Sequence, residues 1–345
     1  MILAESSHPG LQHIPNLVWV LPFAALLLCI AILPLLRKTE HWWHHNRNKL
    51  VIAVLLGLVT LAYYHRRGYG TSVHDAFVVK VLHGLGLHTH AHEGHHTSAT
   101  GMSALAGALG NALMEYIPFM SLLFSLYVIS GGIGVKGDIP AHPRTNVIFL
   151  AIGGVLASLV GTTGAAMLLI RPLLKTNSER KHVVHTVVFF IFIVSNIGGS
   201  LLPIGDPPLF LGYLRGVPFL WTLVLWKEWA FTIVLLLIVY YAWDTFAYRR
   251  EAKPDITRDE RQVERLAVTG KINFLFLAGV VLATGTLAPG RDFVGTSWQP
   301  FTFLREIVQL LFVALSLMLT PRGLRRENNF NYVAILEVAC LFIGI

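Results

Sequence analysis

An apolar segment of the chain is interrupted by the sequence Ser195-Asn196-Ile197-Gly198-Gly199-Ser200-Leu201-Leu202-Pro203-Ile204-Gly205-Asp206-Pro207-Pro208. Proline removes a backbone donor and clashes with the preceding helical turn, and glycine raises the entropic cost of a helix. A helix through His182–Leu214 is therefore expected to unwind here. Unwound backbone at membrane depth is tolerated only where it is buried in protein or lines a wet cavity. The alternative is a Pro-kinked helix in which Asp206 lies at the interface.

The composition places this segment in a membrane protein. Of the 345 residues, 54% are hydrophobic and only 13% are charged, and the mean hydropathy is +0.61. A soluble domain of this size could not bury so much apolar side chain, which excludes a soluble enzyme and a disordered regulator. The net charge of +8 comes from basic residues in short loops, as membrane orientation requires, so no nucleic-acid partner is expected. The two cysteines lie in apolar runs and indicate no disulfide framework.

Runs of apolar residues predict an all-α polytopic protein. We expect N-terminal spans and a His-rich outer loop in residues 1–102, and a first transporter repeat in residues 103–248. Within that repeat we expect a span, a re-entrant hairpin over 146–174, the broken helix over 182–214 and a span over 229–248. We expect residues 249–271 to form a charged cytoplasmic connector, and residues 272–345 to hold further spans and the start of an incomplete second repeat.

The distribution of Lys and Arg supports this topology. If residues 146–174 enter and leave on one side, twenty basic residues lie on that side and five on the other. The positive-inside rule then gives a multi-pass inner-membrane protein with its N-terminus outside. No nucleotide-binding loop or dinucleotide fingerprint is visible, so ATP-driven transport has no support, and we expect no enzyme activity.

The hairpin over 146–174 is predicted from Gly161-Thr162-Thr163-Gly164, which divides an apolar run into two arms too short to cross a membrane. Small residues would let its tip approach another helix, where the hydroxyls of Thr162 and Thr163 reach a central site. A small-residue packing notch in one continuous helix is the alternative.

Two further groups carry ionisable side chains. Glu115 lies in an apolar run, where an acid pairs, protonates or binds a cation, so we expect it, with Asp206, among the proton-coupling residues. Its alternatives are a place near the outer interface or a hydrogen bond to Asn111. The outer loop carries His88, His90, His92, His95 and His96, which could bind zinc or nickel or simply form a solvated loop.

Ser195–Pro208 resembles the motif of the ion transporter superfamily, which includes arsenite permeases, P-protein permeases, D-type sodium/proton antiporters and citrate carriers. Gly161–Pro172 is similar to the hairpin tip that precedes that motif. The closest resemblance is to bacterial citrate-transporter-like sodium/proton antiporters, and it covers about residues 104–243. Many relatives carry Asn in the tip, where this chain has Gly161-Thr162-Thr163.

The resemblance implies an inverted-repeat fold with a re-entrant hairpin and a broken helix in each repeat. It implies a cation site made by residues of the hairpin tip and the broken helix: Thr162, Thr163, Ser195, Asn196, Gly198, Gly205 and Asp206. We expect transport of Na⁺ and H⁺ without a bound cofactor. Cation-coupled transport of citrate or a dicarboxylate is the alternative. The resemblance is also compatible with a homodimer. No second hairpin and no second Gly-Asp-Pro-Pro sequence follow residue 272, so we expect the second repeat to be truncated. A natural half-transporter that dimerises, or a remnant of a longer transporter, is the alternative.

Overall fold

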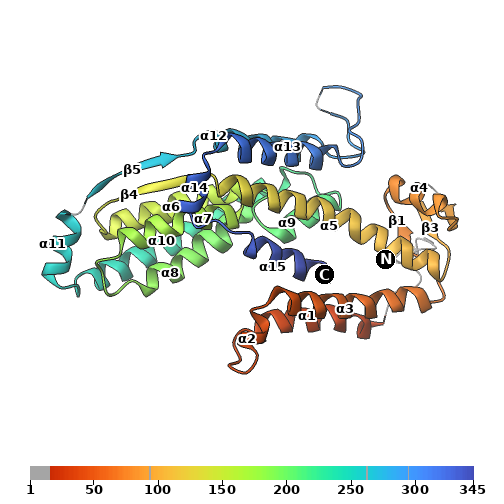
Figure 1. Cartoon of the computed structure of the whole chain (residues 1–345), viewed down its shortest axis with the longest axis horizontal. Coiled ribbons are helices and arrows are strands. Elements are labelled where there is room, and N and C mark those ends of the chain that lie inside the picture. The colour runs from red at the N-terminus through yellow and green to blue at the C-terminus, as the bar shows by residue number, and fades with distance from the viewer. Residues whose placement is uncertain (1–15, 93–94, 262, 294) are drawn as a thin grey trace, which may run out of the picture. The chain divides into compact units, whose positions relative to one another are not determined.

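The computed structural model of the chain describes residues 16–92, 95–261, 263–293 and 295–345. These residues are mostly helical, which confirms an all-α polytopic membrane protein (Figure 1). Five helical segments are long and apolar enough to cross a membrane: Asn46–Arg66, Met102–Ser130, Pro143–Val160, Val184–Leu201 and Trp221–Tyr248. Two short sheets are additional to the expected all-α pattern.

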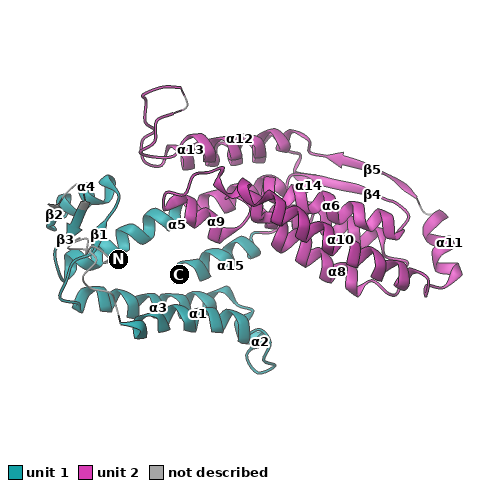
Figure 2. Ribbon diagram, turned by 180° about the vertical axis from the view of Figure 1, so that it is seen from behind, with its two compact units in different colours: residues 1–117, 332–345 teal, residues 118–331 magenta. Residues whose placement is uncertain are grey.

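The chain forms two compact units, which Figure 2 distinguishes by colour. One comprises residues 1–117 and 332–345, and the other comprises residues 118–331. The long helix α5 (Met102–Ser130) contributes to both.

The first unit contains η1 (Leu17–Val20), α1 (Leu21–Ile32), α2 (Glu40–Trp43), α3 (Asn46–Arg66), β1 (Ser72–Val73), α4 (Ala76–Gly84), β2 (Thr89–His92), β3 (His95–Ser98) and α15 (Val333–Phe342). A small core forms where α4 packs on β1, with Val73, Val78, Val79 and Leu82 buried. The α15 helix packs along α3, and the Lys49 ammonium lies 2.7 Å from the Glu337 carboxylate.

The His-rich loop contains β structure. β2 pairs antiparallel with β3, and β3 pairs antiparallel with β1. The sequence did not predict these strands, because two of them hold only four residues and are rich in histidine.

The second unit contains β4 (Gly134–Asp138), α6 (Pro143–Val160), α7 (Thr162–Thr176), α8 (Val184–Phe190), η2 (Ile191–Asn196), η3 (Ile197–Leu201), α9 (Pro207–Leu214), η4 (Trp221–Leu225), α10 (Trp226–Tyr248), α11 (Lys253–Arg261), β5 (Glu264–Thr269), α12 (Ile272–Thr286), α13 (Leu304–Leu319) and α14 (Arg322–Glu327). α6 packs against α7 and α10, and α12 packs against α13.

The connector over 249–271 contains a helix, α11, and a strand, β5, of which the strand was not predicted. After α11, residues of β5 pair antiparallel with β4, from Gly134 opposite Thr269 to Asp138 opposite Glu264. The Asp259 carboxylate of α11 accepts a hydrogen bond of 2.8 Å from the backbone N–H of Ala141. The connector is therefore fixed beside the start of α6.

Candidate functional site

The break between α6 and α7 lies at one residue, Gly161. Its φ of 80° and ψ of 151° lie in a region that is open essentially to glycine alone. α6 ends at Val160 and α7 begins at Thr162, so the chain reverses without an intervening loop. The helix pair therefore has the shape of the predicted hairpin, with Gly161 at its tip. The expectation that both arms are too short to cross a membrane is wrong for the first arm, because α6 has 18 residues and is long and apolar enough to span. Re-entry of this hairpin into a membrane stays a prediction.

The segment after α8 changes its helical type step by step. α8 continues as a π-helix, η2, and then as a 3-10 helix, η3. Leu202 and Asp206 have extended backbone conformations, and α9 starts at Pro207. Such π and 3-10 segments inside helices often mark functional sites. The structure thus unwinds the helix within the glycine- and proline-rich sequence and does not merely kink it.

The hairpin tip lies directly against this unwound segment. The backbone N–H of Thr162 donates a hydrogen bond of 3.1 Å to the carbonyl oxygen of Gly205. The Ser158 hydroxyl of α6 donates a short hydrogen bond to the carbonyl oxygen of Gly198. Two of the predicted glycines are thereby hydrogen-bonded to the hairpin, Gly205 through the tip residue Thr162 and Gly198 through Ser158 of α6.

Only glycine fits at the centre of this contact, because a Cβ atom would clash with the neighbouring chain. A Cβ atom on Gly205 would lie 2.0 Å from the carbonyl oxygen of Gly199. A Cβ atom on Gly199 would lie 2.6 Å from the Thr162 methyl group. Both distances are too short for non-bonded atoms, so any side chain would separate the tip from the unwound segment.

Asp206 occupies the N-cap position of α9 but does not cap it. An N-cap carboxylate ordinarily accepts a hydrogen bond from the second or third backbone N–H of its helix. Pro207 and Pro208 have no N–H, and the N–H of Leu209 donates to the Asp206 carbonyl at 3.1 Å. The half-buried Asp206 carboxylate consequently makes no hydrogen bond or ion pair with any residue that the structure describes.

The other predicted site residues differ in how far their side chains are buried. Thr162 is buried, whereas Thr163, the next residue of the helix, is exposed. Asn196 is also exposed, and Ser195 is partly buried. The structure therefore brings together Thr162, Gly198 and Gly205, with Asp206 next in sequence, and it turns Thr163 and Asn196 outward.

One hydroxyl near the tip was missed in the sequence. The Ser130 side chain at the end of α5 is buried, and its oxygen has no hydrogen-bond partner among the described residues. A Cβ atom on Gly164 would lie only 2.7 Å from that oxygen. Ser130 is thus a neutral oxygen ligand available beside the hairpin tip. No sequence signal distinguished it from other serines of the apolar run.

The two remaining sets of candidates lie in the first unit. Glu115 lies on α5 and is partly buried. Among the described side chains, no three His, Cys, Asp or Glu are grouped to hold a metal ion. His88 and His90 are exposed and His96 is partly buried, while the side chains of His92 and His95 lie outside the described part. A metal function for this loop stays a prediction.

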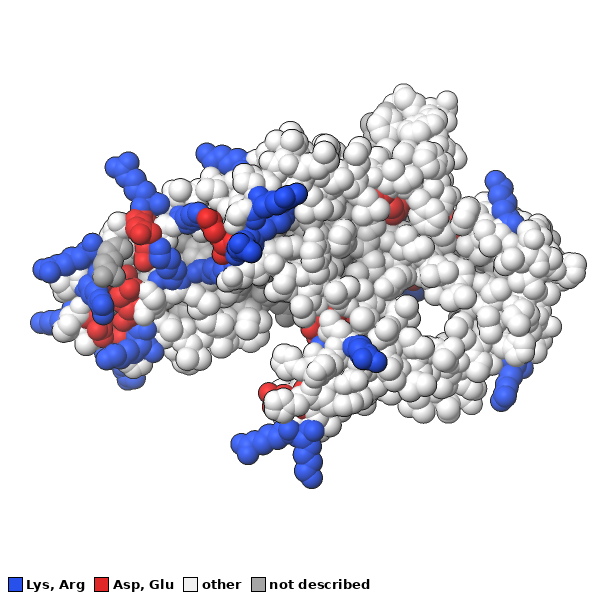
Figure 3. Space-filling model, viewed as in Figure 1, with Lys and Arg blue, Asp and Glu red and all other residues white. Residues whose placement is uncertain are grey.

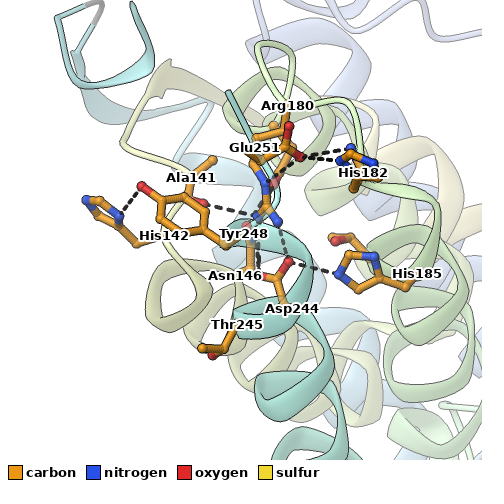
Figure 4. A network of polar contacts seen from close by, with 12 residues as sticks. Ala141, His142, Asn146, Arg180, His182, His185, Asp244, Thr245, Tyr248 and Glu251 are labelled. Carbon is orange, nitrogen blue, oxygen red and sulfur yellow. Dashed lines mark hydrogen bonds and ion pairs between the residues drawn. The ribbon is translucent and has the colours of Figure 1, made fainter. Parts of the chain in front are cut away.

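A second polar centre, which the sequence analysis did not predict, lies at the other end of the hairpin arms (Figure 4). The Arg180 guanidinium donates to the Asp244 carboxylate at 2.5 Å, and both side chains are buried. His185 Nε2 lies 2.8 Å from the same carboxylate, and Asn146 donates to it at 3.2 Å. Four chain segments therefore meet here: the start of α6, the turn after α7, the start of α8 and the end of α10.

Glu251 closes this network outside the membrane spans. Its carboxylate accepts hydrogen bonds from the backbone N–H groups of Lys181 and His182 and lies 3.8 Å from Arg180. Burial alone would raise the pKa of Glu251, but these two N–H groups and the neighbouring cations hold that pKa below its ordinary value. Buried side chains of opposite charge are bonded to one another across this network, which is the arrangement of a structural anchor.

The apolar helices are long enough to span a membrane, and one helix is interrupted at its centre. At the interruption, the Asp206 carboxylate has no hydrogen-bond partner among the described residues. These features define a multi-pass membrane protein with a candidate ion site. Residues 12–85 and 91–345 match the family described as "Putative citrate transport", and the chain belongs to that family. It is therefore a transporter of the citrate-transporter-like group. No curated protein and no solved structure matches the chain.

Proposed function

We propose that this chain is a secondary active transporter of the inner membrane, with its N-terminus outside, that exchanges sodium for protons by alternating access. The observation that supports it best is the Asp206 carboxylate, which two consecutive prolines leave without a capping hydrogen bond. An acid without a partner at membrane depth is costly unless it binds a cation or a proton. Sodium and protons would then compete for this carboxylate.

Neutral oxygens at the hairpin tip and in the unwound segment support a cation rather than an anion as the bound species. Thr162 and Ser130 contribute buried hydroxyls, and the unwound segment contributes backbone carbonyls. Neither the tip (residues 161–164) nor the unwound segment (residues 195–206) contains Lys or Arg. Hard oxygen ligands with one carboxylate are the donor set that a small alkali cation requires.

The second candidate is cation-coupled transport of citrate or a dicarboxylate, which the family description favours. The same cation site would serve it. The N-termini of α7 and α9 begin at the tip and at Asp206, and their dipoles would attract a carboxylate. Arg171 is a weaker contributor, because it is exposed and lies roughly 13 Å along α7 from Thr162.

Transport by the purified chain in proteoliposomes tests the proposal. An imposed sodium gradient is expected to move protons, as read by a pH-sensitive dye, and the Asp206→Asn variant is expected to abolish that movement. Asp292→Asn is the matched control, because Asp292 is an exposed carboxylate in another loop. Sodium-dependent uptake of labelled citrate without proton exchange would replace antiport by the second candidate. Full proton exchange in Asp206→Asn would contradict the assigned site.

A further inference from the structure

A surface groove of about 430 Å³ lies between the first turn of α6 and the last two turns of α10. Its lining is adjacent in sequence to the Arg180–Asp244 network, since Thr145 precedes Asn146 and Thr245 follows Asp244. Figure 4 shows Thr245 and Tyr248 next to that network. The groove is lined by His142, Pro143, Arg144, Thr145, Tyr241, Thr245, Tyr248 and Arg249.

Two guanidinium groups without an ion-pair partner among the described residues line this groove. Arg144 and Arg249 both line it, and neither pairs with any carboxylate that the structure describes. Of the nearby acids, Asp244 is buried and bonded to Arg180, and Glu260 lies 4.0 Å from His142. A groove with two unpaired arginines favours an anion with several acceptor oxygens.

Donor groups beside the arginines also suit such an anion. The Tyr248 hydroxyl and His142 Nδ1 lie 3.0 Å apart across the groove lining. The Tyr248 ring also packs on the Arg180 guanidinium, with 5.3 Å between them. The groove wall is thus held rigidly by the anchor behind it, which is a favourable basis for binding.

The two helices that form the groove continue from it as apolar, exposed faces. α6 exposes Ile148, Ile152, Val155 and Leu159, whose spacing places them on one face. α10 exposes Phe231, Val234, Leu235 and Ile238, whose spacing also places them on one helix face. A ligand that fills the groove and lies along these faces needs an anionic head and apolar chains.

The surroundings of the groove indicate where such a ligand comes from. Figure 3 shows Lys and Arg side chains, with Asp and Glu side chains among them, concentrated over the end of the second unit that carries α11. Lys253, Arg258 and Arg261 lie on that helix, and the α11 carboxylate of Asp259 bonds to Ala141, next to His142. In a multi-pass protein, basic residues concentrated at one end of the helices indicate the leaflet with anionic lipids.

We propose that this groove binds the phosphate head group of an anionic phospholipid, with the acyl chains lying on the exposed faces of α6 and α10. Arg144 and Arg249 bind the phosphodiester oxygens. The lipid bridges the same two helices that Asn146 and Asp244 connect inside the protein. It therefore reinforces the anchored end of the hairpin, independently of which ion the protein transports.

Native mass spectrometry of the full chain, with phosphatidylglycerol titrated against phosphatidylcholine, tests this assignment. The wild type is expected to bind one phosphatidylglycerol in preference to phosphatidylcholine. Arg144→Gln/Arg249→Gln is expected to weaken that binding by about tenfold or more, since each basic residue near a lipid surface contributes on the order of one factor of five. Arg250→Gln is the matched control, because Arg250 is adjacent and exposed but lies over Phe246 outside the groove.

Unchanged phosphatidylglycerol binding in the double variant would overturn the proposal. Displacement of the lipid by inorganic phosphate at equal concentration would overturn the lipid assignment in favour of a soluble anion. If the double variant fails to fold, crosslinking of a photoactivatable phosphatidylglycerol to the wild type tests the lipid site instead. Label within residues 142–145 and 241–249 is expected, and label confined to other segments would contradict the site.

Discussion

The backbone N–H of Thr162 and the carbonyl oxygen of Gly205 lie 3.1 Å apart in a hydrogen bond between the hairpin tip and the unwound helix. No side chain takes part in this bond, so the two backbones must approach each other closely. Gly161, Gly199 and Gly205 permit that approach, each for a reason of conformation or space. The candidate ion site is therefore formed by main-chain geometry as much as by its acid.

The first prediction concerns this close approach. Gly205→Ala places a methyl group 2.0 Å from the carbonyl oxygen of Gly199, so we expect the tip contact to be lost, transport to be abolished and stability to fall by about 1–3 kcal/mol. Gly212→Ala is the control, since its nearest neighbour would be 3.8 Å away. Proteoliposome transport and thermal unfolding in detergent measure both effects. Normal transport by Gly205→Ala would contradict the assigned geometry.

The second prediction concerns the anchor at the other end of the arms. Arg180→Gln leaves the Asp244 carboxylate buried beside His185 without its principal partner, and we expect a loss of about 3–5 kcal/mol. Adding Asp244→Asn removes the buried carboxylate charge that has lost its arginine partner, and it should recover part of that loss of stability. Lys181→Gln serves as the control because its ammonium is exposed. Denaturant titration of the four proteins tests this, and equal stability for Arg180→Gln and Lys181→Gln would argue against the anchor.

The third prediction is a pH dependence. The pKa of Glu251 in the folded protein is below its ordinary value of 4.5, because backbone N–H groups hold the carboxylate. Its contribution is therefore complete above pH 4.5 and is lost as the pH falls through the lower folded value. Glu251→Gln should cost on the order of 2 kcal/mol at neutral pH, and the difference from wild type should shrink in acid. Melting temperatures measured across this range test it; a difference that is constant with pH would exclude the mechanism.

The fourth prediction concerns Asp138, whose charge, unlike that of Glu251, is expected to destabilise the folded protein. Burial raises the pKa of Asp138 in β4 above 3.8, and the nearby carboxylate of Glu179 raises that pKa further. The charged form is thus disfavoured in the folded protein, and this cost appears as the pH rises from 3.8 through the raised value. Asp138→Asn is expected to stabilise the protein by about 1 kcal/mol at neutral pH and to have no effect in strong acid. Destabilisation at neutral pH would show that the Asp138 charge is compensated.

Local backbone chemistry explains why the helix breaks were predictable. Gly161 can adopt its conformation because it has no Cβ, and Pro207 favours the first turn of a new helix. These effects depend on the residue itself and are visible in the sequence. Hydropathy likewise indicated the apolar helices, because burial in lipid acts on each segment separately.

The missed features depend on partners far away in the chain. An acid at position 244 inside an apolar run was a signal for a buried pair. Its partner Arg180 is 64 residues away and could not be identified from spacing. The β4–β5 pairing joins two short segments whose register is set by tertiary contacts. Whether Thr162 or Thr163 faces inward depends on the rotation of α7, which one residue changes by about 100°.

The antiparallel pairing of β4 with β5 has a mechanical consequence. β4 leads into the hairpin and β5 leads into α12, so a backbone ladder joins the bases of two helix pairs. If the hairpin moves during transport, that ladder limits its travel at the end that holds β4. The hairpin would then turn about its base, and the largest displacement would fall at Gly161, beside the candidate ion site.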